Sequence, residues 1–392
     1  MNAPDGQLEV APAHKGVTRP DVEAAFRTAW WAAATKGEHA DFGMALQDGI
    51  DETGGMFRRT LLLALATYGA GFRAAPTEVT QADEGRASVD GLIDEWRQAC
   101  DEYGFEYHTQ PRRELARDLV GDLLDVRQLL MSASGDSQVR SLAAVVARLA
   151  ALTALACTDL GYRREVKHLW RLGRRMAHLA KDPAVLQWVY GHETTSGIYF
   201  GRPLDVVMTI ADQGLAVSAA PTAGRAELLG GKAQALAIVG EHQAAARVLR
   251  TLEETFDQLP DRVTNRSKSI MGWPERRLRH AESFVHSTAG ALTLATRAQD
   301  RALHLYAPSR VISRTQIELH RAECLIRAGY ISDGARHARE TLAHTTEQWR
   351  NRYILATAAK VADAVPDDQR TVPAVAGLCN DLAAAFQPTA SN

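Results

Sequence analysis

Two short segments of this chain combine residue types that could bind a ligand or take part in catalysis. The first, His192-Glu193-Thr194-Thr195, begins like the His-Glu-x-x-His helix of zinc proteases, in which two histidines one turn apart hold the metal. Position 196 is serine, so this zinc chemistry is excluded. The segment is then either a polar helix face or a surface that contacts a ligand.

The second segment is the densest basic cluster of the chain, Arg276-Arg277-Leu278-Arg279-His280, which follows Trp273. Guanidinium groups bind phosphate and carboxylate oxygens through charge-assisted hydrogen bonds, so the cluster could meet a phosphate or an acidic peptide. The alternative is a solvated helix end whose charge is balanced by the acidic residues between positions 254 and 261.

Other catalytic patterns are missing from the sequence. There is no nucleophile elbow and no glycine-rich phosphate loop, and the glycine pairs at 54–55 and 230–231 lack the strand-to-helix context that such a loop needs. The four cysteines lie far apart without the spacing of metal ligands. We therefore expect no metal and no cofactor, and we favour binding over catalysis, although scattered acidic residues and histidines could still assemble a site in space.

The elements that must position these residues are marked by a recurring glycine hinge. Gly161, Gly201, Gly240 and Gly329 lie 40, 39 and 89 residues apart, and each stands between two apolar patterns of helical period. Such a period is the signature of stacked helix-turn-helix units, and the long last interval leaves room for one more unit. There we expect a helix from Trp273 to about Leu294 and a short partner over Gln299–Tyr306.

Composition agrees with an all-α protein. Of the 392 residues, 46% are hydrophobic and only 6% aromatic, and alanine, the best helix former, is prominent. The net charge of −2 gives no general attraction to nucleic acid, so direct DNA binding is doubtful. The most apolar run of the first helices, Leu61–Tyr68, is too short to cross a membrane. We expect a cytoplasmic protein that contacts no membrane.

The predicted architecture is a right-handed superhelical solenoid of divergent helical pairs with a small N-terminal helical bundle. Seven segments make up the chain. They are a tail (1–17), an N-terminal helical segment (18–70), a linker (71–87), a helical adaptor (88–136), the repeat array (137–347), C-terminal capping helices (348–386) and a second tail (387–392).

The pairs resemble tetratricopeptide repeats. That motif has a small residue at the hinge, where the four glycines stand, and small residues where the two helices cross, as at Gly173, Ala177 and Ala180. The chain departs from the motif at the aromatic position three residues after the hinge, and its period near 40 exceeds the usual 34. The resemblance implies a concave groove lined by the first helix of each pair.

The chain also resembles the C-terminal regulatory half of actinobacterial Xre-type transcriptional regulators. The resemblance rests on Met56–Ala64, on the leucine-rich stretch Leu115–Leu130 and on Ala184–Val217. It implies a regulator of transcription or secondary metabolism. The family's helix-turn-helix is not recognisable before Met56, where the stretch Asp41–Asp51 is acidic and would repel phosphate. The chain would then act through another protein or through an unrecognised DNA-binding part.

These patterns predict a regulatory protein whose groove binds a small signal molecule, a peptide or a protein partner. The alternatives are a protein–protein interaction scaffold and an enzyme with its active site in the groove. Adjacent tryptophans, Trp30 and Trp31, predict an interface and are compatible with a homodimer. The residues expected in the groove are Trp188, His192, Thr195, Tyr199, Arg202, Gln234, Trp273, Arg276, His280 and Glu323.

Overall fold

A computed structural model describes residues 89–386, except 134 and 347–348, and these residues form helices with no strand among them. The predicted all-α class is confirmed. Trp30, Trp31, the predicted segments 1–17, 18–70 and 71–87, and the tail 387–392 lie outside the described residues. The helices are α4 (Val89–Glu106), α5 (Arg112–Ser132), α6 (Asp136–Asp159), α7 (Arg163–Ala180), α8 (Pro183–Tyr199), α9 (Leu204–Leu215), α10 (Ala223–Ile238), α11 (His242–Asp257), α12 (Asp261–Thr264), α13 (Glu275–Thr288), α14 (Leu292–Leu305), α15 (Val311–Arg327), α16 (Ile331–His344), α17 (Arg352–Asp363) and α18 (Pro373–Phe386).

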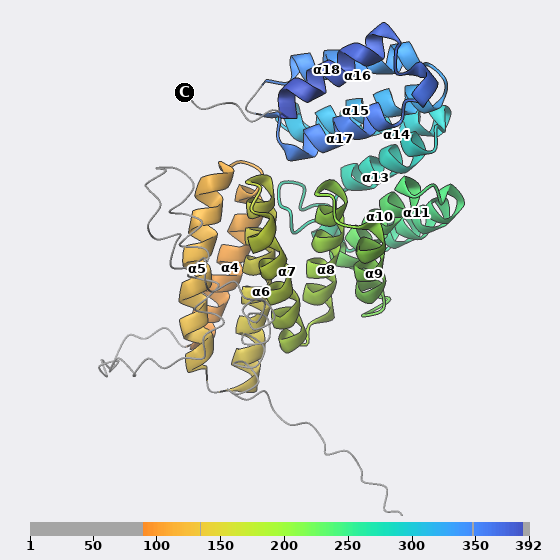
Figure 1. The fold of residues 1–392 in the computed structure, drawn as a ribbon. Helices are drawn as coiled ribbons and strands as arrows, with labels where there is room; N and C mark the ends of the chain where they lie inside the picture. Colours follow the sequence, from red (N-terminus) through yellow and green to blue (C-terminus); the bar gives the residue numbers. More distant parts are fainter. Residues whose placement is uncertain (1–88, 134, 347–348, 387–392) are drawn as a thin grey trace, which may run out of the picture.

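Consecutive helices form pairs, and the pairs follow one another in chain order. The pairs are α6 with α7, α8 with α9, α10 with α11, α13 with α14 and α15 with α16. The first helices also contact one another in the series α6, α8, α10, α13, α15 and α17, so they form an inner row. In Figure 1 the helices run from α5 on the left to α11 on the right, and α13–α18 turn back above them.

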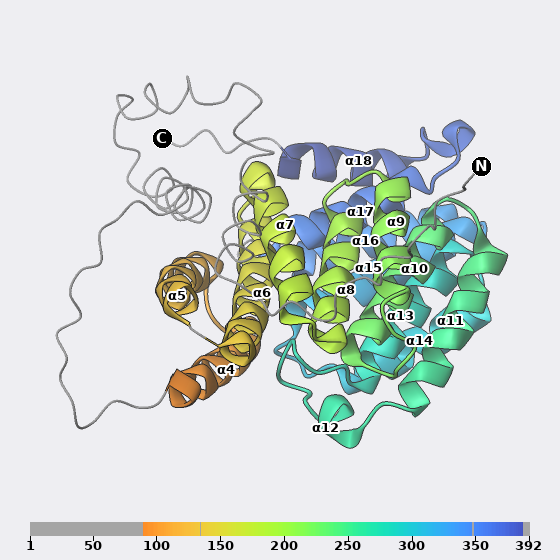
Figure 2. The ribbon, with the colours of Figure 1, turned by 90° about the horizontal axis from the view of Figure 1, so that it is seen from below.

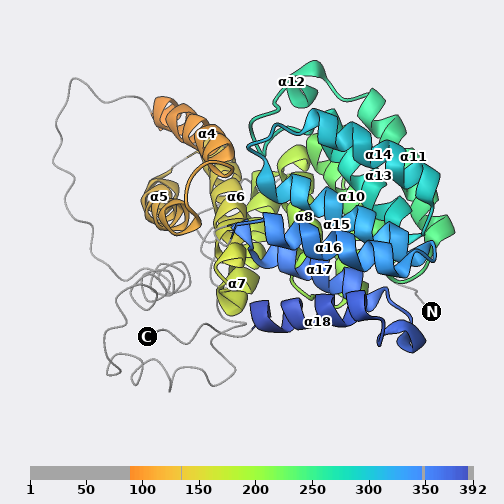
Figure 3. The same cartoon turned by 90° about the horizontal axis from the view of Figure 1, so that it is seen from above.

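Further helices cover the two ends of this arrangement. At one end α4 and α5 pack against α6 and share its buried apolar cluster (Figure 2). At the other end α18 packs against α16 and α17 (Figure 3), around Ile354, Val361 and Leu378, which are fully buried. The α6 helix is long and apolar enough to cross a membrane, but 89% of its apolar window is buried inside the protein. Its alanines and leucines therefore serve as the core between α5, α7 and α8.

The inner helices other than α17 end in the same glycine turn. At Gly240, Gly290 and Gly329 the glycine has a positive φ, and the next residue donates its N–H to the carbonyl five positions back. This is the Schellman ending, which needs a left-handed residue and therefore favours glycine. Gly290 is the hinge of the additional unit, between α13 and α14.

The structure corrects one predicted helix boundary. A single helix was expected from Trp273 to about Leu294, but α13 ends at Thr288 and α14 already begins at Leu292. The break was missed because Ala289 and Ala291 continue the apolar pattern across Gly290, whose φ of 67° ends the helix.

The hinge at Gly201 allows a measurement of how much a non-glycine residue in this turn destabilises the protein. Its φ is 67°, and a Cβ added there would lie 3.8 Å from the nearest side-chain atom, so a substitution causes strain without a clash. We expect Gly201→Val to lower the free energy of unfolding by about 1–2 kcal/mol, measured by urea denaturation. Gly201→Asn should recover part of this loss, because asparagine tolerates left-handed backbone. Equal losses for the two variants would contradict the backbone explanation.

Segments far apart in the sequence meet across the inner row. The N–H of Ile270, in the segment between α12 and α13, donates to the carbonyl of Gly104 in α4 at 2.8 Å, and Arg266 forms an ion pair with Asp101. At the start of α17 the Tyr353 ring packs against Tyr199 at the end of α8, with ring centroids 5.2 Å apart. The chain thereby closes around a cavity.

Candidate ligand-binding site

The cavity lies on the inner row and has a volume of about 570 Å³. This falls within the range of small-molecule sites, which are usually concave and largely apolar with a few placed polar groups. Its walls come from the α4–α5 turn and the start of α5, from α6, α8, α10, α13, α15 and α17, and from three connecting segments. The residues in these connecting segments are Ser269, Ile270, Trp273, Tyr306, Ser309, Arg310, Trp349 and Asn351.

Close packing of α8 against α10 sets one wall. A Cβ added at Gly231 would lie 2.8 Å from the Thr194 side chain, so glycine is what allows the two helices to approach. At this distance the Thr195 hydroxyl donates to the Glu227 carboxylate at 2.8 Å. The wall therefore presents Thr195, which the sequence predicts in the groove, and the buried Glu227, which it does not.

Glu227 is held as a carboxylate by its neighbours. Arg277 forms an ion pair with it at 2.8 Å, and the Trp273 indole N–H donates to it at 2.9 Å. Burial alone would raise the pKa of Glu227, but Arg277, His192 and these hydrogen bonds outweigh burial and lower that pKa. Glu227 thus neutralises the charge of Arg277.

A second carboxylate, Asp159 at the end of α6, neutralises Arg112. The two side chains form an ion pair at 2.5 Å, and the Arg112 guanidinium lies over the Tyr107 ring at 4.3 Å from its centroid. Asp159 is almost fully buried, with a side-chain exposure of 4%. This pair fixes the α4–α5 turn against the body of the array.

Arg276 and Arg310 have no comparable carboxylate. Arg276 donates to the backbone carbonyl of Ser267 and lies over the Tyr306 ring, while Arg310 donates to the carbonyl of Lys268 at 3.4 Å. No acidic side chain of the described residues forms an ion pair with either of them. Burial lowers the pKa of Arg276 to about 10, with Arg310 and Arg277 adding to the effect, and burial also lowers the pKa of Arg310.

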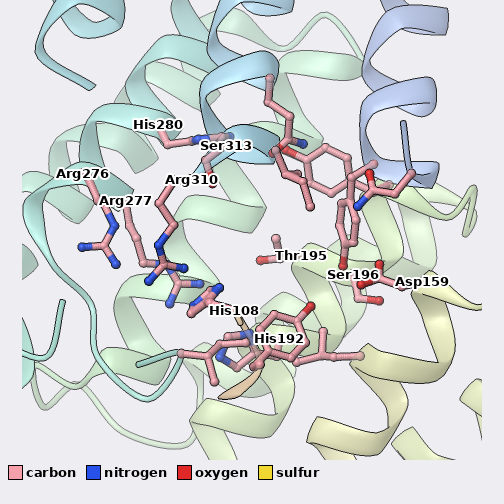
Figure 4. Close-up of a pocket in the computed structure, with 18 of the residues that line it drawn as sticks. His108, Asp159, His192, Thr195, Ser196, Arg276, Arg277, His280, Arg310 and Ser313 are labelled. Carbon is pink, nitrogen blue, oxygen red and sulfur yellow. The ribbon is translucent and has the colours of Figure 1, made fainter. Parts of the chain in front are cut away.

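The cavity therefore has an uneven charge. Its wall contains four arginines and two carboxylates, so two positive charges are left over. Figure 4 shows Arg276, Arg277 and Arg310 together with His108 at one end of the cavity, and Asp159 with Ser196 at the other. A half-buried cationic cluster of this kind attracts an anion.

The histidines of the wall are neutral at physiological pH. Burial lowers the pKa of His192 and of His280 to about 4, and burial together with the four arginines brings the pKa of His108 well below its ordinary value. His280 shares a hydrogen bond with the Tyr306 hydroxyl at 3.2 Å. These imidazoles can therefore donate or accept hydrogen bonds, but they add no charge.

The low pKa of His192 predicts a loss of stability in acid. The unfolded chain protonates this histidine near pH 6.5, whereas the folded protein resists until about pH 4, so protons favour unfolding across this window. Because of His192, we expect the free energy of unfolding to fall by about 3 kcal/mol between pH 7.5 and pH 4. Urea denaturation at each pH measures this free energy. The variant His192→Gln should show a shallower pH dependence. An unchanged slope would mean that His192 is already protonated in the folded protein or is not buried.

The structure brings most of the predicted groove residues together. Those that line the cavity are His192, Thr195, Tyr199, Gln234, Trp273, Arg276 and His280. Three others do not line it. The Trp188 ring packs edge-on against the ring of His192, Arg202 forms an ion pair with the buried Glu193, and Glu323 forms an ion pair with Arg327. Their helical spacing was compatible with the groove, but these contacts hold them elsewhere.

Sequence reasoning missed the rest of the wall. The unpredicted residues are Tyr107, His108, Arg112, Asp159, Glu227, Arg277, Tyr306, Arg310, Gln316 and Tyr353, among others. Arg277 belonged to the noted basic cluster, but the tyrosines and Arg310 stand outside any motif. Their convergence results from the closure of the chain, which no local pattern encodes.

Comparison with known protein families, with curated proteins and with solved structures found no match. No family is assigned. The resemblance to tetratricopeptide repeats and to Xre-type regulators stays a prediction. Among the described residues, no three histidine, cysteine or acidic side chains come together in an arrangement that could hold a metal ion.

Proposed function

We propose that this chain is a regulatory protein that binds a small organic anion in the cavity of its helical array. One observation carries the proposal. A half-open cavity of about 570 Å³ has two arginines, Arg276 and Arg310, without a carboxylate partner among the described residues. Both guanidinium groups are half-buried. Because taking a charge out of water is costly unless it is paired, an anionic ligand would supply the missing partner.

The shape of the cavity favours a small molecule over a protein partner. A scaffold that binds a folded partner or a long peptide needs an open groove, and here two segments cross it. One segment contains Ile270, which is hydrogen-bonded to α4, and the other contains Tyr353, which is packed on Tyr199. A signal molecule would fit the space between these segments, while a protein partner would need to use another surface.

Regulation would follow because the wall of the cavity is built from elements that are far apart in the sequence. A ligand in the cavity would touch the α4–α5 turn, the middle of the array and the start of α17 at once, and would favour the closed arrangement over any more open one. The change would be passed to a second copy of the chain or to another regulator. A cytoplasmic location and an action on transcription or secondary metabolism belong to this proposal.

Native mass spectrometry of the protein purified from its own host, beside a denatured sample, tests the proposal directly. A retained mass that is lost on denaturation, and that is absent from Arg276→Gln protein, would support an anion in the cavity. A bare protein mass, together with no thermal stabilisation by a panel of organic anions, would leave the scaffold alternative. Turnover of a bound anion would favour the enzyme alternative.

A further inference from the structure

We infer that the anion is a phosphate monoester with a planar ring, its phosphoryl group lying between Arg276, Arg310 and the amino end of α15. This inference rests on the proposed function and narrows it to one chemical class. It is carried by the charge balance of the cavity, by the free donors at the end of α15 and by the side chains at the opposite end.

The charge balance specifies a ligand with two negative charges. Arg112 is paired with Asp159 and Arg277 with Glu227, so only Arg276 and Arg310 remain. The two come from different elements, one from the first turn of α13 and one from the residue before α15, and Figure 4 shows them at the same end of the cavity. A monocarboxylate would neutralise one of them, whereas a phosphate monoester has about two charges at neutral pH.

The amino end of α15 adds backbone donors at the same place. Arg310 is its N-cap residue and provides no side-chain cap, and Val311, Ile312 and Ser313 all line the cavity. Among the described residues, no acceptor is found for the backbone N–H groups of these three. The positive end of a 17-residue helix with free N–H groups is a preferred place for phosphate oxygens.

A phosphoryl group matches this donor set better than a carboxylate does. It has three terminal oxygens, so it can accept from two guanidinium groups and from backbone N–H groups at the same time. A carboxylate has only two oxygens. A dicarboxylate has enough oxygens but spreads them over two groups, while the unpaired donors here gather at one end.

The rest of the cavity suits a planar ring with a hydrogen-bond donor. Tyr199 packs on Tyr353, and Tyr353 interacts with Asp159, which Figure 4 shows at the end away from Arg276 and Arg310. Trp273 and Trp349 also line the wall. Aromatic side chains favour offset or edge-on contact with another ring. The amide oxygen of Gln234, a lining residue with 5% exposure, has no hydrogen-bond partner among the described residues. A buried acceptor of this kind is costly to leave unpaired. An N–H group on the ring of the ligand would donate the missing hydrogen bond to this amide oxygen.

Isothermal titration calorimetry of the full chain with four matched probes tests the inference. The probes are phenyl phosphate, with a ring and a double charge, glycerol phosphate, with the double charge and no ring, benzoate, with a ring and one charge, and phenol, with a neutral ring. Their affinities separate the contribution of the double charge from that of the ring. At pH 7.5 we expect phenyl phosphate to bind most tightly, glycerol phosphate and benzoate at least about tenfold more weakly, and phenol not at all. Affinity for phenyl phosphate should fall below pH 6, where the dianion takes up a proton.

Variants identify the place of binding. Arg276→Gln and Arg310→Gln should each weaken phenyl phosphate by about tenfold to a hundredfold, because each removes a charge-assisted hydrogen bond. Arg297→Gln, which removes an exposed arginine of α14 outside the cavity, should leave the affinity unchanged. Melting temperatures without ligand show whether each variant is folded, so a loss of binding can be separated from a loss of structure.

The outcomes separate the inference from the proposed function. If benzoate binds as tightly as phenyl phosphate and both depend on Arg276 and Arg310, the phosphoryl class is wrong and the anion site stands. If phosphates bind but the two arginine variants bind them equally well, the inferred place is wrong. If no probe binds and the protein from its host retains no anion, both the inference and the proposed function fail.

Discussion

Replacing Gly224 with alanine should destabilise the protein by about 3 kcal/mol, at the upper end of the usual cost of overpacking. A Cβ at this position would lie 2.3 Å from the backbone nitrogen of Trp188 and 2.5 Å from the carbonyl carbon of Gln187. These are main-chain atoms of α8, which cannot turn aside as a flexible side chain can. The helices α8 and α10 would have to separate.

The surroundings of Gly224 leave little room for such a movement. The buried Gln187 amide donates to the carbonyls of Gly214 and Ser218, and it accepts from the Thr222 hydroxyl just before α10. Since separation of the helices also breaks these hydrogen bonds, the cost exceeds that of a simple clash. Urea denaturation followed by circular dichroism measures the free energy of unfolding.

The same substitution at Gly121 is the matched control. Gly121 lies on the exposed face of α5, and an added Cβ meets no atom within 4 Å. Gly121→Ala should therefore stabilise the protein by up to about 1 kcal/mol, through the higher helix propensity of alanine. Opposite signs for the two substitutions are the expected result. A Gly224→Ala protein as stable as the parent would refute the close approach of α8 and α10.

Replacing Glu193 with alanine should also cost about 3 kcal/mol, the lower end of the range for breaking a buried ion pair. The Glu193 side chain is fully buried and forms ion pairs with Arg174 of α7 and with Arg202, the latter at 2.6 Å. Removing the carboxylate leaves two guanidiniums side by side. Both arginines are partly exposed and can recover some hydration, which is why the lower end applies.

The control for Glu193 is a solvent-exposed pair. Asp94 forms an ion pair with Arg97 on α4, with side-chain exposures of 73% and 49%. Asp94→Ala should change the free energy of unfolding by less than about 1 kcal/mol, because exposed pairs gain little over their separate hydration. If both variants lost the same stability, the burial of Glu193 would not be the reason for its effect.

The parts of the fold that were predictable from the sequence are local. Helices follow from apolar residues at helical spacing, and the hinges follow from glycines whose positive φ other residues avoid. Gly290 has the same conformation, but its alanine neighbours hid it, so the α13–α14 boundary was misplaced. Local sequence specifies a turn well only where the flanking residues also stop favouring helix.

The site was partly predictable, for a different reason. His192, Thr195 and Tyr199 share one face of α8, so helical spacing placed them together. Arg202 seemed to continue that face, but the chain turns at Gly201 and the side chain reaches back to Glu193. Arg310 and Tyr353 reach the cavity only because distant segments pack against each other, which depends on the whole fold.

The closure of the chain around the cavity has a consequence for how the protein unfolds. In an open repeat array each unit touches only its neighbours, so the ends can fray while the middle persists. Here the bond from Ile270 to Gly104 and the packing of Tyr353 on Tyr199 link units that are not adjacent in sequence. Unfolding of one end of the array therefore removes contacts that stabilise the other end, so we expect the described part to unfold in one cooperative step. The same links must form across long loops, whose closure costs entropy, so folding should be slower than in an open array of equal length.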